Sequence, residues 1–487
     1  MKGNNLTNKV VNATKWASIT EISAKIVSPI SNMILARIIA PEAFGVVATV
    51  TMIMSFADMF TDAGFQKYLV QHDFRDEEEK FDNANVAFWT NIVISILLLL
   101  GIIIFRQQIA ELVGNPGLGN VVAIACVQLV FTSFSSIQMA LYRRNFNYKE
   151  LFLVRMVTVS IPFVVTVPLA LFGLGFWSLI VGGIFMQFAN SVILTVNSKW
   201  KPKLFYDIKI LKEMLSFSVW SLIEAVSIWL TVWVDVFIIG SSFNQYYLGI
   251  YKTSTGMVNV LMGIVTSSTV PVLFAALSRL KNDDNQFKIM LYKTQRFVSI
   301  LVFPLGVGSY IYSNLATKIL LGSQWNEASG VIGVYALTNS IIIVFGYYCS
   351  EVYRAKGRPR LSLFAQVLHL VFLIPTCIIS AKYGFWIFVY ARSWAIIEFV
   401  LVHFILIKIS MGFPVSKMIK NVFPTAFSAT LMGFLGYFLQ LINKQTVWSV
   451  ISIIICALFY FGILLLFPNM RVEIYGMIKR LKLKRLN

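Results

Sequence analysis

The sequence predicts an all-α polytopic membrane protein with fourteen transmembrane helices. Three observations support this prediction. Of the 487 residues, 57% are hydrophobic and 13% are charged, apolar segments recur along the whole chain, and the breaks between them carry Gly, Pro, Asn or charge. A soluble protein would carry about twice this share of charged residues. Because about 20 apolar residues suffice to cross a bilayer, each segment is long enough for one span.

The fourteen predicted spans follow one another with short breaks. The N-terminal lysines precede no short apolar region with a cleavage site, so we expect no cleaved signal peptide and insertion directed by the first helix. The approximate ranges of the spans are 14–39, 43–63, 84–105, 119–141, 151–172, 175–197, 213–239, 246–275, 297–319, 329–352, 361–381, 384–407, 421–442 and 446–467.

The distribution of basic residues tests this count independently. When the loops are numbered alternately, one set carries 32 lysines and arginines, and the other carries 5. Basic residues gather in cytoplasmic loops, so both termini are expected in the cytoplasm and the number of spans is even. The net charge of +19 therefore indicates topology rather than nucleic-acid binding. The five on the other side are Arg37, Arg106, Lys318, Lys382 and Lys444.

An internal repeat divides the chain. Trp16 and Gly45 are 29 residues apart, as are Trp220 and Gly249. Six spans per repeat is an even number, so the repeats share one orientation in the membrane, and the sequence predicts two pseudo-symmetric six-helix bundles plus two appended helices. Further pairs, at shifts of 203 to 211 residues, are Glu21 and Glu224, Asn32 and Asp235, Tyr142 and Tyr353, and Gly175 and Gly384.

The repeat gives the predicted domain organisation. An N-terminal bundle covers residues 1–198, and a C-terminal bundle covers residues 213–408. Residues 199–212 form a basic cytoplasmic connector between them. Spans 13 and 14 lie within residues 409–470, and residues 471–487 form a basic cytoplasmic tail.

Polar residues form a stripe along each of the first two spans. In both spans they recur at every third or fourth position, which places them on one helical face. A charged face within a span cannot turn toward lipid, so it faces other helices or a water-filled cavity. The stripe residues are Ser18, Glu21, Lys25, Ser28 and Asn32 in the first span, and Thr51, Ser55, Asp58 and Asp62 in the second.

Three cations at membrane depth are the predicted substrate-binding residues for an anion in a cavity: Lys25, Lys252 and Arg392. Lys25 lies about 16 Å into the bilayer at 1.5 Å per residue. Glu21 and Lys25 alternatively form a structural pair one turn apart, and Arg155 extends toward the membrane surface. Glu398 is left unassigned. The predicted cavity residues with a polar or ion-coupling role are Glu21, Asn32, Asp58, Glu224 and Asp235.

No motif indicates an enzyme. The chain lacks a Walker-type glycine loop, and no catalytic or metal site is predicted. Its histidines, His72, His369 and His403, are scattered along the sequence. The cysteines lie in apolar segments without the spacing of a metal or redox motif. They are Cys126, Cys349, Cys377 and Cys456.

Two stretches carry a family resemblance. The helix break Ala40-Pro41-Glu42-Ala43-Phe44-Gly45, with Asp62-Ala63-Gly64-Phe65 and Val70-Gln71 after it, resembles the N-terminal signature of Wzx-type polysaccharide flippases. The segment Leu141–Tyr148 resembles that family's connector between spans 4 and 5. The family belongs to the multidrug/oligosaccharidyl-lipid/polysaccharide exporter superfamily, and the resemblance covers essentially the whole chain.

The resemblance implies two bundles around a central cavity. It implies translocation of an undecaprenyl-diphosphate-linked oligosaccharide (an O-antigen or other polysaccharide unit) from the cytoplasmic to the outer leaflet of the bacterial inner membrane, by alternating access. The implied partners are that lipid-linked glycan, the bilayer and glycan polymerase or assembly proteins. No resident cofactor is implied, and coupling to H⁺ or to Na⁺ stays open.

Other functions are compatible with these patterns. A cation-coupled multidrug exporter of the same superfamily would usually have twelve spans and an acidic, aromatic cavity. A membrane-embedded glycan polymerase or ligase would present a large external loop, whereas the external loops expected here have about 15 residues or fewer. A non-transporting assembly subunit is a further alternative.

Overall fold

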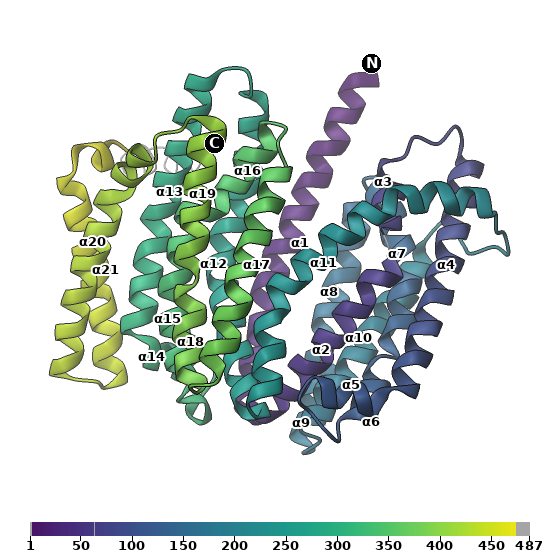
Figure 1. Ribbon diagram of the computed structural model, residues 1–487, viewed down its shortest axis with the longest axis horizontal. Coiled ribbons are helices and arrows are strands. Elements are labelled where there is room, and N and C mark those ends of the chain that lie inside the picture. The colour runs from purple at the N-terminus through teal and green to yellow at the C-terminus, as the bar shows by residue number, and fades with distance from the viewer. Residues whose placement is uncertain (1, 63, 474–487) are drawn as a thin grey trace. The chain divides into compact units, whose positions relative to one another are not determined.

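Helices make up all the regular structure in the part of the chain that the computed structural model describes (Figure 1). That part is the backbone of residues 2–62 and 64–473, without the side chains of residues 2–11, 14, 18, 22, 62, 216–224 and 271. Within it, 12 helical segments are long and apolar enough to cross a membrane. The bent pair α13 (Asp284–Ile311) and α14 (Ser313–Leu320) is a thirteenth candidate. The protein is thus an all-α polytopic membrane protein, and its fourteen spans stay a prediction.

Among the described residues, the first helix, α1 (Lys2–Ile38), does not count as a candidate span. It covers the first predicted span, but the polar stripe through Glu21, Lys25 and Asn32 lowers its hydropathy. Such a helix needs neighbours that cover its polar face. It packs mainly along α8 (Tyr148–Ile161), where the rings of Trp16 and Phe152 lie 5.2 Å apart.

The chain forms two units, Met1–Lys252 and Thr253–Asn487. The first unit contains the helices up to the start of α12 (Gln245–Arg279). Between α1 and α12 they are α2 (Pro41–Asp62), α3 (Phe65–Gln71), α4 (Glu77–Ile104), α5 (Arg106–Leu112), α6 (Gly119–Ala125), α7 (Gln128–Arg144), α8, η1 (Pro162–Thr166), α9 (Val167–Leu171), α10 (Phe176–Asn197) and α11 (Ile208–Ser242).

The second unit holds the remaining helices. After α13 and α14 they are η2 (Ser323–Trp325), α15 (Ala328–Ile342), η3 (Ile343–Tyr347), α16 (Tyr348–Ala355), α17 (Arg360–Ala381), α18 (Phe385–Trp394), α19 (Ile396–Met411), α20 (Val415–Ile442) and α21 (Thr446–Leu466). Four residues separate the end of α12 from the start of α13. Asp283 caps it by accepting hydrogen bonds from the backbone N–H groups of Asn285 and Gln286, at 3.1 and 3.0 Å.

Two glycines related by the sequence repeat let α2 and α12 cross closely. A Cβ atom on Gly45 would collide with the carbonyl oxygen of Gln245, and one on Gly249 with that of Pro41. The Gly249 Cβ would also lie 3.0 Å from the Gly45 nitrogen. Backbones can approach this closely in a membrane only where side chains are absent. The crossing joins the start of α12 to the first unit.

Helix α11 also belongs to the first unit because it packs against α2. The indole N–H of Trp229 donates a 3.0 Å hydrogen bond to Ser55 Oγ, and the rings of Trp229 and Phe56 lie 4.9 Å apart. The division of the chain therefore falls after Lys252, within α12, about one helix beyond the predicted start of the C-terminal bundle at residue 213.

Candidate functional site

A cavity of about 390 Å³ lies inside the first unit, between α1, α7, α8 and α10. Its floor is apolar: Met139, Leu151, Val154 and Leu194 line it and belong to one cluster of packed side chains. The walls carry polar groups from each of the four helices. This volume lies in the range of small-molecule sites, which usually combine an apolar surface with a few polar groups.

Helix α8 contributes more lining residues than the other three helices. Tyr148, Leu151, Arg155 and Thr158 line the cavity, and their spacing of three or four residues places them on one helical face. The facing helix α10 contributes Gln187 and, one turn later, Asn190.

Two adjacent arginines at the end of α7 have different surroundings. Arg143 lines the cavity, and its guanidinium also donates a 3.3 Å hydrogen bond to Gln66 Oε1 in the first turn of α3. Arg144 points to the end of α3 instead, where its guanidinium donates hydrogen bonds to the carbonyl oxygens of Leu69, Val70 and His72 at 3.0, 3.2 and 2.6 Å. These carbonyls have no partners within α3, so Arg144 caps that helix.

A second interaction connects α3 to a neighbouring helix. The Tyr68 hydroxyl donates a 3.2 Å hydrogen bond to the Glu213 carboxylate of α11. Burial, and then the nearby Glu213 charge, raise the pKa of the Tyr68 phenol, which therefore stays protonated as a donor. Together, Tyr68 and Arg144 hold α3 against α11 and α7.

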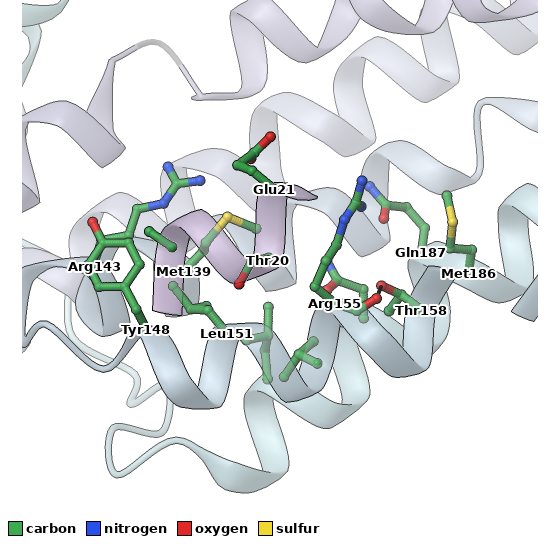
Figure 2. Close-up of a pocket in the computed structure, with 14 residues that line it drawn as sticks. Thr20, Glu21, Met139, Arg143, Tyr148, Leu151, Arg155, Thr158, Met186 and Gln187 are labelled. Carbon is green, nitrogen blue, oxygen red and sulfur yellow. Dashed lines mark hydrogen bonds between the residues drawn. The ribbon is translucent and has the colours of Figure 1, made fainter. Parts of the chain in front are cut away.

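Three charged side chains define the chemistry of the cavity: Arg143, Arg155 and Glu21. In Figure 2 their head groups point away from the apolar floor, with Glu21 between the two arginines. Among the described side chains, neither Arg155 nor Glu21 forms an ion pair within 4.0 Å. Guanidinium groups bind phosphate oxygens in a bidentate manner, and a carboxylate accepts hydrogen bonds from sugar hydroxyls. The cavity thus suits a ligand with an anionic and a hydroxylated part.

Of the predicted site residues, Glu21 lines this cavity. Lys25, one turn further along α1, is half-buried and is not among the lining residues, and Asn32 is exposed. The Lys252 ammonium lies 3.8 Å from the ring centroid of Trp233 in α11. Such a cation–π contact stabilises a charge away from water.

The predicted acidic residues have local partners. Asp58 accepts a 3.0 Å hydrogen bond from the Thr132 hydroxyl. Buried Asp235 accepts a 2.7 Å hydrogen bond from the Tyr251 hydroxyl and a 2.8 Å bond from the Val236 N–H. Glu224 lies in α11, but its side chain is outside the described residues.

Arg392 lies in the second unit, half-buried in α18, close enough to His369 to act on it electrostatically. The His369 Nδ1 and Glu398 Oε2 atoms lie 2.8 Å apart. Phe399 contacts both His369 and His403, with ring centroids 4.7 and 4.5 Å apart. The structure thus brings together two histidines that are scattered in sequence, and gives the unassigned Glu398 a partner. In the described part of the chain, no three His, Cys, Asp or Glu side chains gather as metal ligands would.

Sequence reasoning missed Arg143, Gln187 and Asn190, and it assigned Arg155 to the membrane surface. The depth of Arg155 in its span alone predicts a side chain that extends to the membrane surface. The signal that identifies it is the helical face that it shares with Tyr148 and Thr158, opposite a polar face on the next span.

The fold and this cavity define a multi-pass membrane protein with a polar, charged chamber inside a helical bundle. The model of the polysaccharide biosynthesis protein family matches residues 34–330, which is more than half of the chain. The chain belongs to this family.

Individual relatives are more distant. The succinoglycan biosynthesis transport protein ExoT of Rhizobium meliloti is 25% identical over 309 residues, which are 63% of this chain and 62% of that protein. The lipopolysaccharide biosynthesis protein WzxC of Escherichia coli is 20% identical over 77% of this chain and 76% of its own length. The chain therefore spans less than two thirds of the first of these relatives.

Solved structures share the fold. The lipid II flippase MurJ, in an inward closed conformation, matches with a TM-score of 0.77 and 16% identity over 93% of this chain and 99% of its own. An inward-facing multidrug resistance transporter of the MATE family matches with a TM-score of 0.61 and 13% identity, over 84% of this chain and 99% of its own. At these identities the likeness shows the fold alone.

Proposed function

We propose that this protein is a flippase that moves a lipid-linked, anionic saccharide across the membrane for polysaccharide biosynthesis. The observation that carries the proposal is the cavity with Arg143, Arg155 and Glu21 above an apolar floor. A polar headgroup needs such a chamber to cross the hydrocarbon layer. Without hydrogen-bond partners, each of its polar groups would cost on the order of several kcal/mol in hydrocarbon.

The family and its members support this proposal. One relative is a transport protein of succinoglycan biosynthesis, and another is a probable flippase of glycan biosynthesis from Haloferax volcanii, 24% identical over 36% of this chain. These descriptions concern those proteins. They agree with the chemistry of the cavity, which suits phosphate and sugar hydroxyls and contains no cluster of acidic residues such as would favour a cationic drug.

We propose further that the substrate is an undecaprenyl-diphosphate-linked oligosaccharide, moved from the cytoplasmic to the outer leaflet of the bacterial inner membrane by alternating access of two bundles. The basic loops then lie in the cytoplasm with both termini. Lys25, Lys252 and Arg392 bind the diphosphate during part of the cycle, and the polar groups of α1, α2 and α11 accept sugar hydroxyls or the coupling ion. Glycan polymerase and assembly proteins receive the product.

The double substitution of Arg143 and Arg155 by alanine tests the proposal. We expect surface polysaccharide to fall at least about tenfold in a deletion strain carrying this variant, because about 1.4 kcal/mol of lost phosphate binding is a tenfold loss. Surface polysaccharide is measured by antibody or lectin staining, and the amount of protein in the membrane by immunoblotting.

Lys149→Ala is the matched control, since Lys149 is an exposed cation of α8 next to Tyr148 that does not line the cavity. It should keep normal polysaccharide levels. Normal levels in the double variant would refute the assignment of the cavity. Resistance to cationic dyes that is lost with the protein, while polysaccharide stays normal, would favour a multidrug exporter instead.

A further inference from the structure

A second cavity, of about 450 Å³, lies in the second unit where α13 and α14 meet α20 and α21. Helix α14 makes an angle of 87° with α13, so it runs across the end of the spanning helices. The cavity lies at the end of α13 that is opposite the turn of Leu280–Asp283. The basic residues Arg279 and Lys281 therefore lie at the far end of α13 from this cavity. Under the topology predicted from the basic loops, the cavity lies on the external side of the membrane.

The walls of this cavity are built from packed elements. Helices α20 and α21 run side by side (Figure 1) and are tied by the Trp448 indole, which donates a 2.8 Å hydrogen bond to the Leu439 carbonyl. The Gln440 amide donates a 3.1 Å hydrogen bond to Ser449 Oγ. Tyr312 of the cavity wall is buried, and its hydroxyl lies 3.3 Å from Cys456 Sγ of α21. The polar groups of the cavity thus lie on helices that hydrogen bonds and packing hold together.

The charge of the cavity is entirely positive. Lys318 and Lys444 line it, and none of its lining residues is an aspartate or glutamate. The Lys318 ammonium donates a 3.3 Å hydrogen bond to the neutral Thr446 hydroxyl. Two ammonium groups around one chamber repel each other, and an anion between them removes that repulsion. Asn314 and Gln440 add neutral hydrogen-bonding groups.

The rim next to this cavity is strongly apolar. At the end of α20, Phe438 is 61% exposed, Leu441 60% and Ile442 71%. In a membrane protein such side chains face acyl chains, while the lysines beside them lie at the level of the lipid phosphates. A ligand that fits both surfaces has an anionic head and a hydrocarbon tail.

We propose that Lys318 and Lys444 form a binding site for the phosphate headgroup of a membrane lipid. This site would give spans 13 and 14 a function of their own. Two lipids supply the same chemistry: an anionic phospholipid, or the lipid-linked diphosphate after translocation. The second source rests on the proposed function, and the first does not.

Native mass spectrometry of the full-length protein tests this site. The protein is purified in detergent containing equal amounts of phosphatidylglycerol and phosphatidylcholine. We expect the double variant Lys318→Gln/Lys444→Gln to retain about one phosphatidylglycerol fewer than the wild type, because its site has lost both charges. Lys382→Gln, at another exposed lysine of this unit that does not line the cavity, is the matched control and should retain the wild-type number. Lys318→Arg/Lys444→Arg should restore it.

Equal retention by the wild type and the double glutamine variant would overturn the proposal. A second arm adds farnesyl diphosphate or farnesol, which share a tail and differ in the phosphates. Displacement of the phospholipid by the diphosphate identifies the lipid-linked diphosphate as a ligand, and no displacement identifies the phospholipid. Displacement by farnesol as well would overturn the phosphate site. No transport is measured here, so a failure of this site and a failure of the cavity with Arg143 are distinguishable.

Discussion

Neighbouring residues of one type have different surroundings in this protein. Arg143 and Arg144 are adjacent at the end of α7, where consecutive side chains point about 100° apart. Arg143 therefore reaches the cavity of the first unit, while Arg144 reaches the carbonyl oxygens at the end of α3. The stretch that resembles the flippase connector thus contains one residue suited to ligand binding and one that holds the fold.

Replacement of Arg144 by alanine should lower the stability of the protein. It removes three charge-assisted hydrogen bonds and leaves carbonyl oxygens at the end of α3 without this partner, at a cost of about 2 kcal/mol. It also removes the contact of the guanidinium with the Phe74 ring, 4.6 Å away. We expect a lower midpoint of thermal unfolding in detergent, measured by tryptophan fluorescence. Arg143→Ala is the control, because it removes one exposed hydrogen bond to Gln66 and leaves the cap of α3 in place. Equal midpoints for the two variants would contradict the capping role.

Among the elements, the crossing of α2 and α12 leaves no room for larger side chains. It depends on Gly45 and Gly249, which each meet a backbone carbonyl of the other helix. The polar stripes of α1 and α2 do not form one site, since their members have separate surroundings. Asp58 bonds to Thr132, Ser55 bonds to Trp229, and Glu21 lines the cavity.

Substitution of Gly249 by alanine should disturb this crossing. The added methyl group collides with the backbone of Pro41, which cannot move as a side chain could, so a loss of about 1–3 kcal/mol or more is expected. Less protein should then reach the membrane, as measured by fluorescence of a C-terminal fusion. Gly256→Ala is the control in the same helix, because nothing lies within 4 Å of its Cβ position. If both variants accumulate equally, the crossing tolerates a methyl group at residue 249.

At the scale of the whole molecule, the three cations that the sequence predicts to bind an anion are divided between the two units. Lys25 and Lys252 belong to the first unit, and Arg392 belongs to the second. Under the proposed alternating-access mechanism both units act on one substrate, so we expect each unit to supply part of its binding.

Lys25→Ala and Arg392→Ala test this requirement separately. Each variant should abolish surface polysaccharide without lowering the amount of protein in the membrane, because an anion that loses a cation partner in a low-dielectric cavity binds much more weakly. Staining of cells and immunoblotting of membranes measure the two quantities. Lys149→Ala again serves as the control. Wild-type polysaccharide in both variants would remove these residues from the site.

The amino-acid sequence was sufficient to predict the all-α membrane class, since hydropathy over about 20 residues depends on local composition. It also located the break at Pro41 and one cavity residue, Glu21, because helical periodicity is a local property. Tertiary packing determines which polar faces meet. Arg155 joins Arg143 and Gln187 because α7, α8 and α10 pack together, and Glu398 joins His369 across two helices. It also decided that α11 packs on α2, so that the first unit extends to Lys252. Periodicity gives the direction of a face along its own helix, whereas the identity of the facing helix depends on contacts between distant parts of the chain.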